Sequence, residues 1–382
     1  MKTFKIILVT GLCTTLSSCF KAEAPNTECD ITSASIHTAN PSEIFYNASD
    51  TLVSVMPTSS SVQFKVRRKA DLTSMAPWFQ LTPGATIVPA NGSVHDFSQG
   101  PVAYRVTSED GEWHREYTVS FTPMTKQTSD TVHYDFEHYR LDEKYGRFYE
   151  WDEVDEDGNV QSVWASGNGG FKFAKGSAKS DEYPTVSIAE GYDGACVRLT
   201  TCDTGKFGTM VNMPLAAGNL FLGEFDVAIA TKEPLQATHF GIPFDKVPGK
   251  LTGYYKYKPG EKFQNKDRTI VEGKIDEGAI YAVFYKNHDA EGNPVVLHGD
   301  DVKTNPNIVG LAEVLPVAPT EEWRPFEAEF KMKEEIDIDL LNSFGYSLAV
   351  VFSASADGAY FQGAIGSTLH IDKVSVICTK AE

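Results

Sequence analysis

The fold class is set by a stretch that reads Ala103-Tyr104-Arg105-Val106-Thr107-Ser108-Glu109-Asp110-Gly111 and continues from Trp113 to Phe121. Apolar and polar residues alternate on both sides of the Asp-Gly pair, which is typical of two antiparallel strands joined by a tight turn. Another alternating run extends from Ser61 to Val66. Residues 29–123 are therefore predicted to form an immunoglobulin-like β-sandwich.

A second, larger domain is expected downstream. Residues 124–130 show almost no apolar pattern and are interpreted as a linker, and residues 131–382 contain further short strand-like runs separated by turn residues. Strands do not alternate with helical segments, so Rossmann and TIM architectures are not expected. The chain is thus predicted to be all-β, with an immunoglobulin-like sandwich followed by a jelly-roll β-sandwich.

The composition limits the classes of partner. The 382 residues include 34 Lys and Arg against 52 Asp and Glu, which gives a formal net charge of −18. Binding to phosphate backbones needs clustered Lys and Arg, so a nucleic-acid partner is not expected. Aromatic residues make up 12% of the chain, which argues against extensive disorder.

The first 18 residues have the pattern of an export signal. Lys2 and Lys5 lie at its start, and an apolar stretch extends from Phe4 to Leu16. This stretch is too short to span a bilayer, and the segment ends in Leu16-Ser17-Ser18-Cys19. This ending resembles the bacterial lipoprotein signal, in which the cysteine is lipidated and becomes the first mature residue. Cys19 is therefore the predicted lipidation site, and residues 19–28 are the predicted tether. The alternative is a plain secretory signal in which Cys19 is incidental.

Aromatic residues of the larger domain are candidates for sugar binding, because a ring can stack on the C–H face of a sugar while polar groups at its edge meet the hydroxyls. In a regular strand Tyr254 and Lys256 would share one face, and Tyr255 and Tyr257 the other. A platform that uses both Tyr254 and Tyr257 therefore needs a loop. The alternative is that most of these rings pack in the core. The predicted ligand-binding residues are Trp151, Trp164, Asp245, Tyr254, Tyr257 and Trp323.

Glu137 and Asp372 are the candidates for a structural calcium site. They lie near the start and the end of the larger domain, and the first and last strands of jelly-roll sugar-binding modules often lie together. Carboxylate oxygens are the ligands that Ca²⁺ prefers. The alternative is a surface carboxylate that faces Lys373 or an arginine.

Evidence for catalysis is weaker. The chain has no G-x-S-x-G elbow, P-loop or H-E-x-x-H motif. Paired carboxylates cleave glycosidic bonds, but among 52 acidic residues no spacing distinguishes an acid from a nucleophile. Four acidic residues lie near aromatics, namely Glu150, Asp152, Glu261 and Asp267.

Several motifs resemble the PCMD family, whose name denotes a domain of carbohydrate metabolism. The resemblance covers about residues 131–378 and rests on Gly167-Asn168-Gly169-Gly170, Gly191-Tyr192-Asp193-Gly194, Phe240-Gly241-Ile242-Pro243-Phe244, Gly253-Tyr254-Tyr255-Lys256-Tyr257 and the closing segment 358–369. It implies a β-sandwich of carbohydrate-binding type, an immunoglobulin-like domain before it, and a surface or periplasmic lipoprotein that works beside other glycan-uptake proteins. No catalytic residues follow from the resemblance.

Together these patterns predict an exported outer-membrane lipoprotein, attached to the membrane only by its lipid, that binds a polysaccharide or glycoconjugate non-covalently. Two alternatives stay open at this point. One is a glycoside hydrolase with two carboxylates in one cleft. The other is a structural or adhesive surface lipoprotein without a small ligand.

Overall fold

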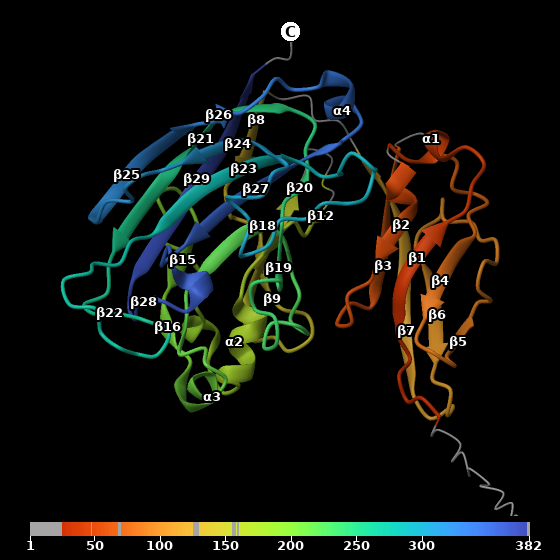
Figure 1. Ribbon diagram of the computed structural model, residues 1–382, viewed down its shortest axis with the longest axis horizontal. Coiled ribbons are helices and arrows are strands. Elements are labelled where there is room, and N and C mark those ends of the chain that lie inside the picture. The colour runs from red at the N-terminus through yellow and green to blue at the C-terminus, as the bar shows by residue number, and fades with distance from the viewer. Residues whose placement is uncertain are drawn as a thin grey trace, which may run out of the picture.

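A computed structural model describes residues 25–46, 48–67, 70–124, 130–154, 158 and 160–379. Figure 1 shows a small N-terminal domain, in red and orange, beside a larger domain in yellow to blue. Both are built from β-sheets, so the prediction of an all-β chain with a smaller sandwich followed by a larger one is confirmed. In the described part of the chain no helix is both long and apolar enough to cross a membrane.

The N-terminal domain is a sandwich of two sheets around one apolar core. The predicted hairpin is present, with Thr107 opposite His114 across the turn. One sheet has the order β2 (Leu52–Ser54), β1 (Ile31–Ile36), β4 (Pro77–Leu81). The other has the order β3 (Ser61–Arg67), β7 (His114–Met124), β6 (Val102–Thr107), β5 (Thr86–Val88), in which β3 and β7 are parallel. Short helices α1 (Pro41–Ile44) and η1 (Ala48–Thr51) lie between β1 and β2, two neighbouring strands of the first sheet.

Two large antiparallel sheets form the second domain. The eight-stranded sheet has the order β13 (Trp164–Ala165), β18 (Asn219–Phe225), β27 (Tyr346–Ser353), β23 (Ala279–Lys286), β24 (Ile308–Glu313), β26 (Lys331–Met332), with β19 (Thr238–Phe240) and β20 (Ile242–Pro243) paired at its side. The six-stranded sheet has the order β14 (Thr185–Ile188), β15 (Cys196–Thr200), β29 (Thr368–Thr379), β21 (Val247–Lys258), β25 (Thr320–Glu329), with β8 (Thr131–Tyr134) beside β29.

Smaller elements surround these sheets. The two-stranded pairs are β9 (Tyr139–Leu141) with β10 (Tyr149–Trp151), β11 (Glu153–Val154) with β12 (Val160–Gln161), β16 (Cys202–Asp203) with β17 (Leu215–Ala216), and β22 (Phe263–Gln264) with β28 (Gly363–Ala364). The helices are α2 (Asn168–Ala174), α3 (Gly205–Met210), α4 (Ile338–Asn342), η2 (Ser180–Glu182) and η3 (Gly358–Tyr360).

The two large sheets differ in how much of their surface is covered. Their inner faces pack against each other and form the main core. The outer face of the eight-stranded sheet is covered too, because Leu297 and Val302 pack on Tyr281 and Val351. Strand β21 of the six-stranded sheet instead alternates between buried and half-buried residues. The outer face of the six-stranded sheet is therefore partly open to solvent along β21.

The two domains touch through a small set of side chains. The ring of Tyr46 meets the edge of Phe344 with centroids 4.8 Å apart, and His288 lies 3.7 Å from Asp50.

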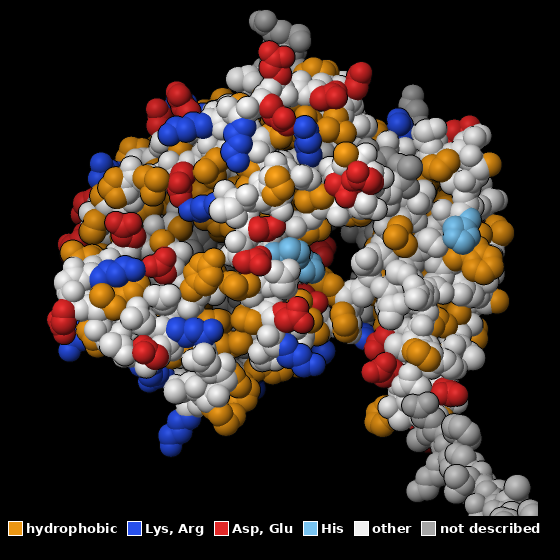
Figure 2. All heavy atoms as spheres, in the orientation of Figure 1, with side chains coloured by type: hydrophobic (Ala, Val, Ile, Leu, Met, Phe, Trp, Pro, Cys, Tyr) orange, Lys and Arg blue, Asp and Glu red, His pale blue; other side chains and the backbone are white. Residues whose placement is uncertain are grey.

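The surface of the larger domain carries both signs of charge. Figure 2 shows acidic and basic side chains interspersed over its visible face.

Candidate functional site

Three aromatic rings gather on the outer face of the six-stranded sheet. Tyr254 comes from β21, Trp323 from β25, and Tyr192 from the loop between β14 and β15. The rings of Tyr192 and Tyr254 are stacked, with centroids 3.7 Å apart and planes at 11°. Tyr192 also meets Trp323 edge to face at 6.3 Å. We call these three residues the aromatic face.

Two carboxylates hold the loop that carries Tyr192. Asp372, a fully buried residue of β29, accepts the backbone N–H groups of Tyr192 and Asp193 at 2.6 and 3.0 Å. Glu137 accepts the N–H of Ala195 with both carboxylate oxygens, at 3.0 and 3.1 Å. Charge-assisted hydrogen bonds to Asp372 and Glu137 therefore hold the backbone of the loop that carries Tyr192.

Two positions of this loop require glycine, because the loop backbone lies against the two carboxylates. A Cβ atom on Gly194 would lie 2.0 Å from a carboxylate oxygen of Glu137, and one on Gly191 would lie 2.6 Å from a carboxylate oxygen of Asp372. Gly194 also has a φ of +84°, which side chains disfavour. The two glycines let the loop backbone approach both carboxylates closely.

Polar groups lie at the edge of the aromatic face. The Lys256 ammonium lies over the Trp323 ring, 5.1 Å from its centre, and the His370 ring meets Trp323 edge to face with centroids 6.3 Å apart. Burial, and then the positive charges of Arg198 and Lys256, lower the pKa of His370 to about 4. His370 is therefore neutral at pH 7, with one ring nitrogen that donates and one that accepts. Flat rings beside such donors and acceptors suit a sugar.

A cluster of acidic residues lies at β10 and β11. Arg140 forms ion pairs with Glu150 and Asp152. Glu153, the next residue, accepts the indole N–H of Trp164 at 2.6 Å. Burial raises the pKa of Glu153 to about 7, and the negative charges of Asp135 and Asp152 add to this. A carboxyl group that stays protonated near neutral pH has the property of a general acid.

Comparison with family models identifies the larger domain. The model of PCMD, described as "Putative carbohydrate metabolism domain", matches residues 135–377. The chain belongs to the PCMD family. A second model, described as "SGBP, N-terminal", matches residues 45–121.

Two solved structures resemble this PCMD protein along most of their own lengths. One, from Bacteroides thetaiotaomicron, is 39% identical, covers 94% of this chain and all of its own, and superposes with a TM-score of 0.78. The other, from Bacteroides vulgatus, is 35% identical, covers 65% of this chain and 98% of its own, with a TM-score of 0.60. Both are described as a "putative glycoside hydrolase". Among curated proteins there is no match.

The PCMD domain brings together only two of the six predicted ligand-binding residues, Tyr254 and Trp323. Segment 247–258 is a continuous strand with register shifts rather than a loop, and Tyr257 faces the core and is 1% exposed. Trp151 and Trp164 are 2% and 7% exposed, within the main core. Asp245 is 5% exposed. These four residues present no surface to a sugar, and their assignment to an exposed platform is corrected.

The predicted calcium ligands of the PCMD domain both contact the Tyr192 loop, Asp372 at Tyr192 and Asp193 and Glu137 at Ala195. Their oxygens accept N–H groups, and Lys373 lies 3.4 Å from Glu137. Within the described residues no group of three His, Cys, Asp or Glu side chains could hold a metal ion. Calcium here stays a prediction, while the geometry gives Glu137 and Asp372 the role of holding the loop.

Sequence reasoning missed Tyr192, Lys256, His370 and Arg198 as members of the site. Tyr192 lies in the Gly191-Tyr192-Asp193-Gly194 motif of the PCMD domain, and the two glycines around one aromatic were the available signal. Arg198 lies opposite His370, and His370 opposite Lys256, across neighbouring strands. Only strand register brings these three together. Cys19, the predicted lipidation site, lies outside the described residues.

Proposed function

We propose that this PCMD protein binds a polysaccharide or glycoconjugate non-covalently at the aromatic face. The stack of Tyr192 on Tyr254 beside Trp323 is the observation that supports it. A base stacked on an aromatic side chain contributes on the order of 1–3 kcal/mol by alanine substitution, and we expect a sugar stacked on this face to gain a contribution of the same kind. Lys256, His370 and Arg198 supply hydrogen bonds along one side.

The neighbouring groups favour binding over covalent chemistry at this face. The carboxylates of Asp372 and Glu137 accept backbone N–H groups of the Tyr192 loop, which is a positioning role. A glycosidase needs two carboxyl groups that face the sugar, about 5–10 Å apart. Lys256 and His370 are hydrogen-bonding groups that orient hydroxyls, as a recognition site requires.

The experiment uses the soluble chain, residues 20–382, on a glycan array and then in calorimetry with the glycan class that binds. Tyr254→Ala, Trp323→Ala and Tyr192→Ala should each weaken binding about tenfold or more, which corresponds to about 1.4 kcal/mol. Tyr360→Ala and Trp113→Ala are matched controls, since both rings are exposed elsewhere. Loss of binding in the controls, or binding by none of the glycans, would contradict the proposal.

The proposal includes export and anchoring through a lipid on Cys19. The segment Leu16-Ser17-Ser18-Cys19 supports it, and the "SGBP, N-terminal" match is in keeping with a surface glycan-binding protein that works beside glycan-uptake proteins. In cells fed an alkyne fatty acid, the native chain should become labelled and enter the outer-membrane fraction. Cys19→Ser should abolish the label, and an unchanged label would exclude this anchor.

A glycoside hydrolase is the second candidate, favoured by the raised pKa of Glu153 beside Asp152 and by the relatives described as putative glycoside hydrolases. Release of reducing ends from a bound glycan would show hydrolysis. Glu153→Gln should then abolish turnover, and Glu261→Gln, a substitution at an exposed carboxylate, should not. Binding without release of reducing ends would leave recognition as the function. No binding at all would favour the structural or adhesive alternative.

A further inference from the structure

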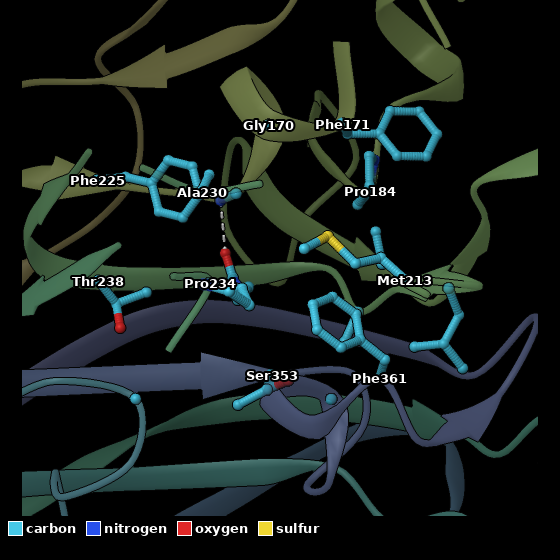
Figure 3. A pocket seen from close by; sticks show the side chains of 18 of the residues that line it. Gly170, Phe171, Pro184, Met213, Phe225, Ala230, Pro234, Thr238, Ser353 and Phe361 are labelled. Carbon is cyan, nitrogen blue, oxygen red and sulfur yellow. Dashed lines mark hydrogen bonds between the residues drawn. The ribbon is translucent and has the colours of Figure 1, made fainter. Parts of the chain in front are cut away.

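A cavity of about 200 Å³ lies away from the aromatic face, between helices α2 and α3 and the outer side of β18 and β27. Figure 3 shows labelled side chains from several segments around it, among them Phe171, Met213, Phe225 and Phe361. Of the described residues that line it, none is Asp, Glu, Lys, Arg or His. Burying a charge without a partner is costly, so this cavity favours an uncharged ligand.

Most polar groups in the wall already have partners inside the protein. The hydroxyl of Thr185 donates to the carbonyl of Asn219, and the hydroxyl of Thr204 donates to the carbonyl of Met213. Thr238 is different: its hydroxyl oxygen is buried and has no hydrogen-bond partner among the described residues. Because this oxygen is buried, it is not open to a ligand in the cavity either, and the wall presents mainly apolar surface.

The volume of the cavity suits one aromatic ring. An apolar cavity of about 150 Å³ accommodates benzene, so about 200 Å³ accommodates one substituted ring. The wall contains Phe171, Phe225 and the Met213 sulfur, which make favourable contacts with aromatic rings. Small residues such as Gly170 keep this space open. A Cβ added to Gly170 would lie 3.4 Å from the Phe225 ring and would occupy part of the space.

The rim offers an apolar entrance. Phe173 on α2 is 57% exposed, and Phe207 on the neighbouring helix α3 is 40% exposed. Both also line the cavity. Large apolar side chains held in water beside an apolar cavity are typical of a ligand entrance rather than of an ordinary surface.

We infer that this cavity binds a small uncharged aromatic group, held by the apolar and aromatic side chains of its wall. The site is separate from the aromatic face and does not depend on the proposed glycan binding. A free aromatic molecule and an aryl substituent on a glycan share this chemistry.

The test uses ¹⁹F NMR on residues 20–382 with two probes of similar size, 4-fluorobenzyl alcohol and 4-fluorobenzoate. The alcohol should show saturable line broadening, and the charged benzoate should bind at least about tenfold more weakly. Equal binding of both probes, or no saturable broadening by the alcohol, would overturn the inference. An aryl glycoside that displaces the alcohol identifies the ligand as a glycan substituent, whereas displacement by benzyl alcohol alone identifies it as a free aromatic.

Variants assign the binding to the cavity. Ala230→Phe fills space beside Gly170 and should abolish binding of 4-fluorobenzyl alcohol, while the same substitution at the exposed Ala103 of β6 should not. Gly170→Ala adds a Cβ 3.4 Å from the Phe225 ring and only narrows the space, so it tests the site even if Ala230→Phe fails to fold. It should weaken binding of 4-fluorobenzyl alcohol at least about threefold. Unchanged binding in both variants would overturn the assignment to the cavity, and loss of binding in Tyr254→Ala would overturn the separation of the two sites.

Discussion

The buried carboxylate of Asp372 accepts the backbone N–H of Tyr192 at 2.6 Å, across 180 residues of sequence. This bond fixes the loop that lays the Tyr192 ring on Tyr254. Asp372 thus positions a loop on the outer face of the sheet through the backbone N–H groups of that loop. Asp372, a predicted calcium ligand, therefore holds the loop that carries the Tyr192 ring.

Asp372→Ala should lower both stability and glycan affinity. The variant leaves the N–H groups of Tyr192 and Asp193 without their buried acceptor, which should cost about 2–4 kcal/mol in the free energy of unfolding. Glycan affinity should fall to the level of Tyr192→Ala, because the ring loses its fixed position. Urea denaturation and calorimetry measure the two effects. Unchanged affinity in Asp372→Ala, together with lost affinity in Tyr192→Ala, would show that the loop keeps its position without this bond.

Calcium at Glu137 and Asp372 can be tested directly. N–H groups already point at both carboxylates, and an N–H donor and a cation compete for the same lone pairs. We therefore expect the melting temperature to be the same in 1 mM calcium and in 1 mM EDTA to within about 1 °C, against the roughly 2–4 °C that a 1 kcal/mol change produces in a domain of this size. A clear rise with calcium that disappears in Glu137→Gln would establish the ion.

His370 should make the protein less stable in mild acid. Its pKa is lowered to about 4 by burial and by Arg198 and Lys256, so the unfolded chain binds the proton more readily. The stability from neutral His370 is fully present above about pH 6.5 and is lost as the pH falls toward 4. His370→Gln should remove up to about 3 kcal/mol of this pH dependence. Identical pH profiles of unfolding for the two proteins would contradict the lowered pKa.

Glycan binding should show little pH dependence from pH 5.5 to 8, because His370 stays neutral throughout. Calorimetry at three pH values measures this in the native chain. A sharp change of affinity near pH 6.5 that His370→Gln removes would mean that His370 titrates normally.

Glu153 should change the pH dependence of stability in the opposite direction to His370. Its pKa is raised to about 7, mainly by burial, so the folded chain holds the proton more tightly than the unfolded chain. The favourable contribution is fully present below about pH 4.5 and is lost as the pH rises through 7. In Glu153→Gln, which still accepts the Trp164 indole N–H, this decline between pH 4.5 and 7 should be absent. Urea titrations across that range measure it, and a decline of equal size in both proteins would assign it to other groups.

The period of two in segment 247–258 predicted which side chains share a face. Tyr254 and Lys256 do lie on the outer side, and Tyr255 and Tyr257 on the inner side. The alternation holds because successive side chains of a strand point to opposite faces. It could not show which face meets water. Both faces of the eight-stranded sheet carry apolar residues, and the second sheet and the segment around Leu297 cover them.

Local pattern by itself determined the strands, the hairpin at Asp110-Gly111 and the two-domain order, because turn chemistry and alternation act between residues close in sequence. Burial of Trp151, Trp164 and Tyr257 was decided only by the tertiary structure, since any large aromatic suits both a core and a binding surface. The same holds for the site. Tyr192, Tyr254 and Trp323 come from three separate segments, and only the register of β21 with β25 and β29, with Asp372 holding the loop, brings their rings into contact.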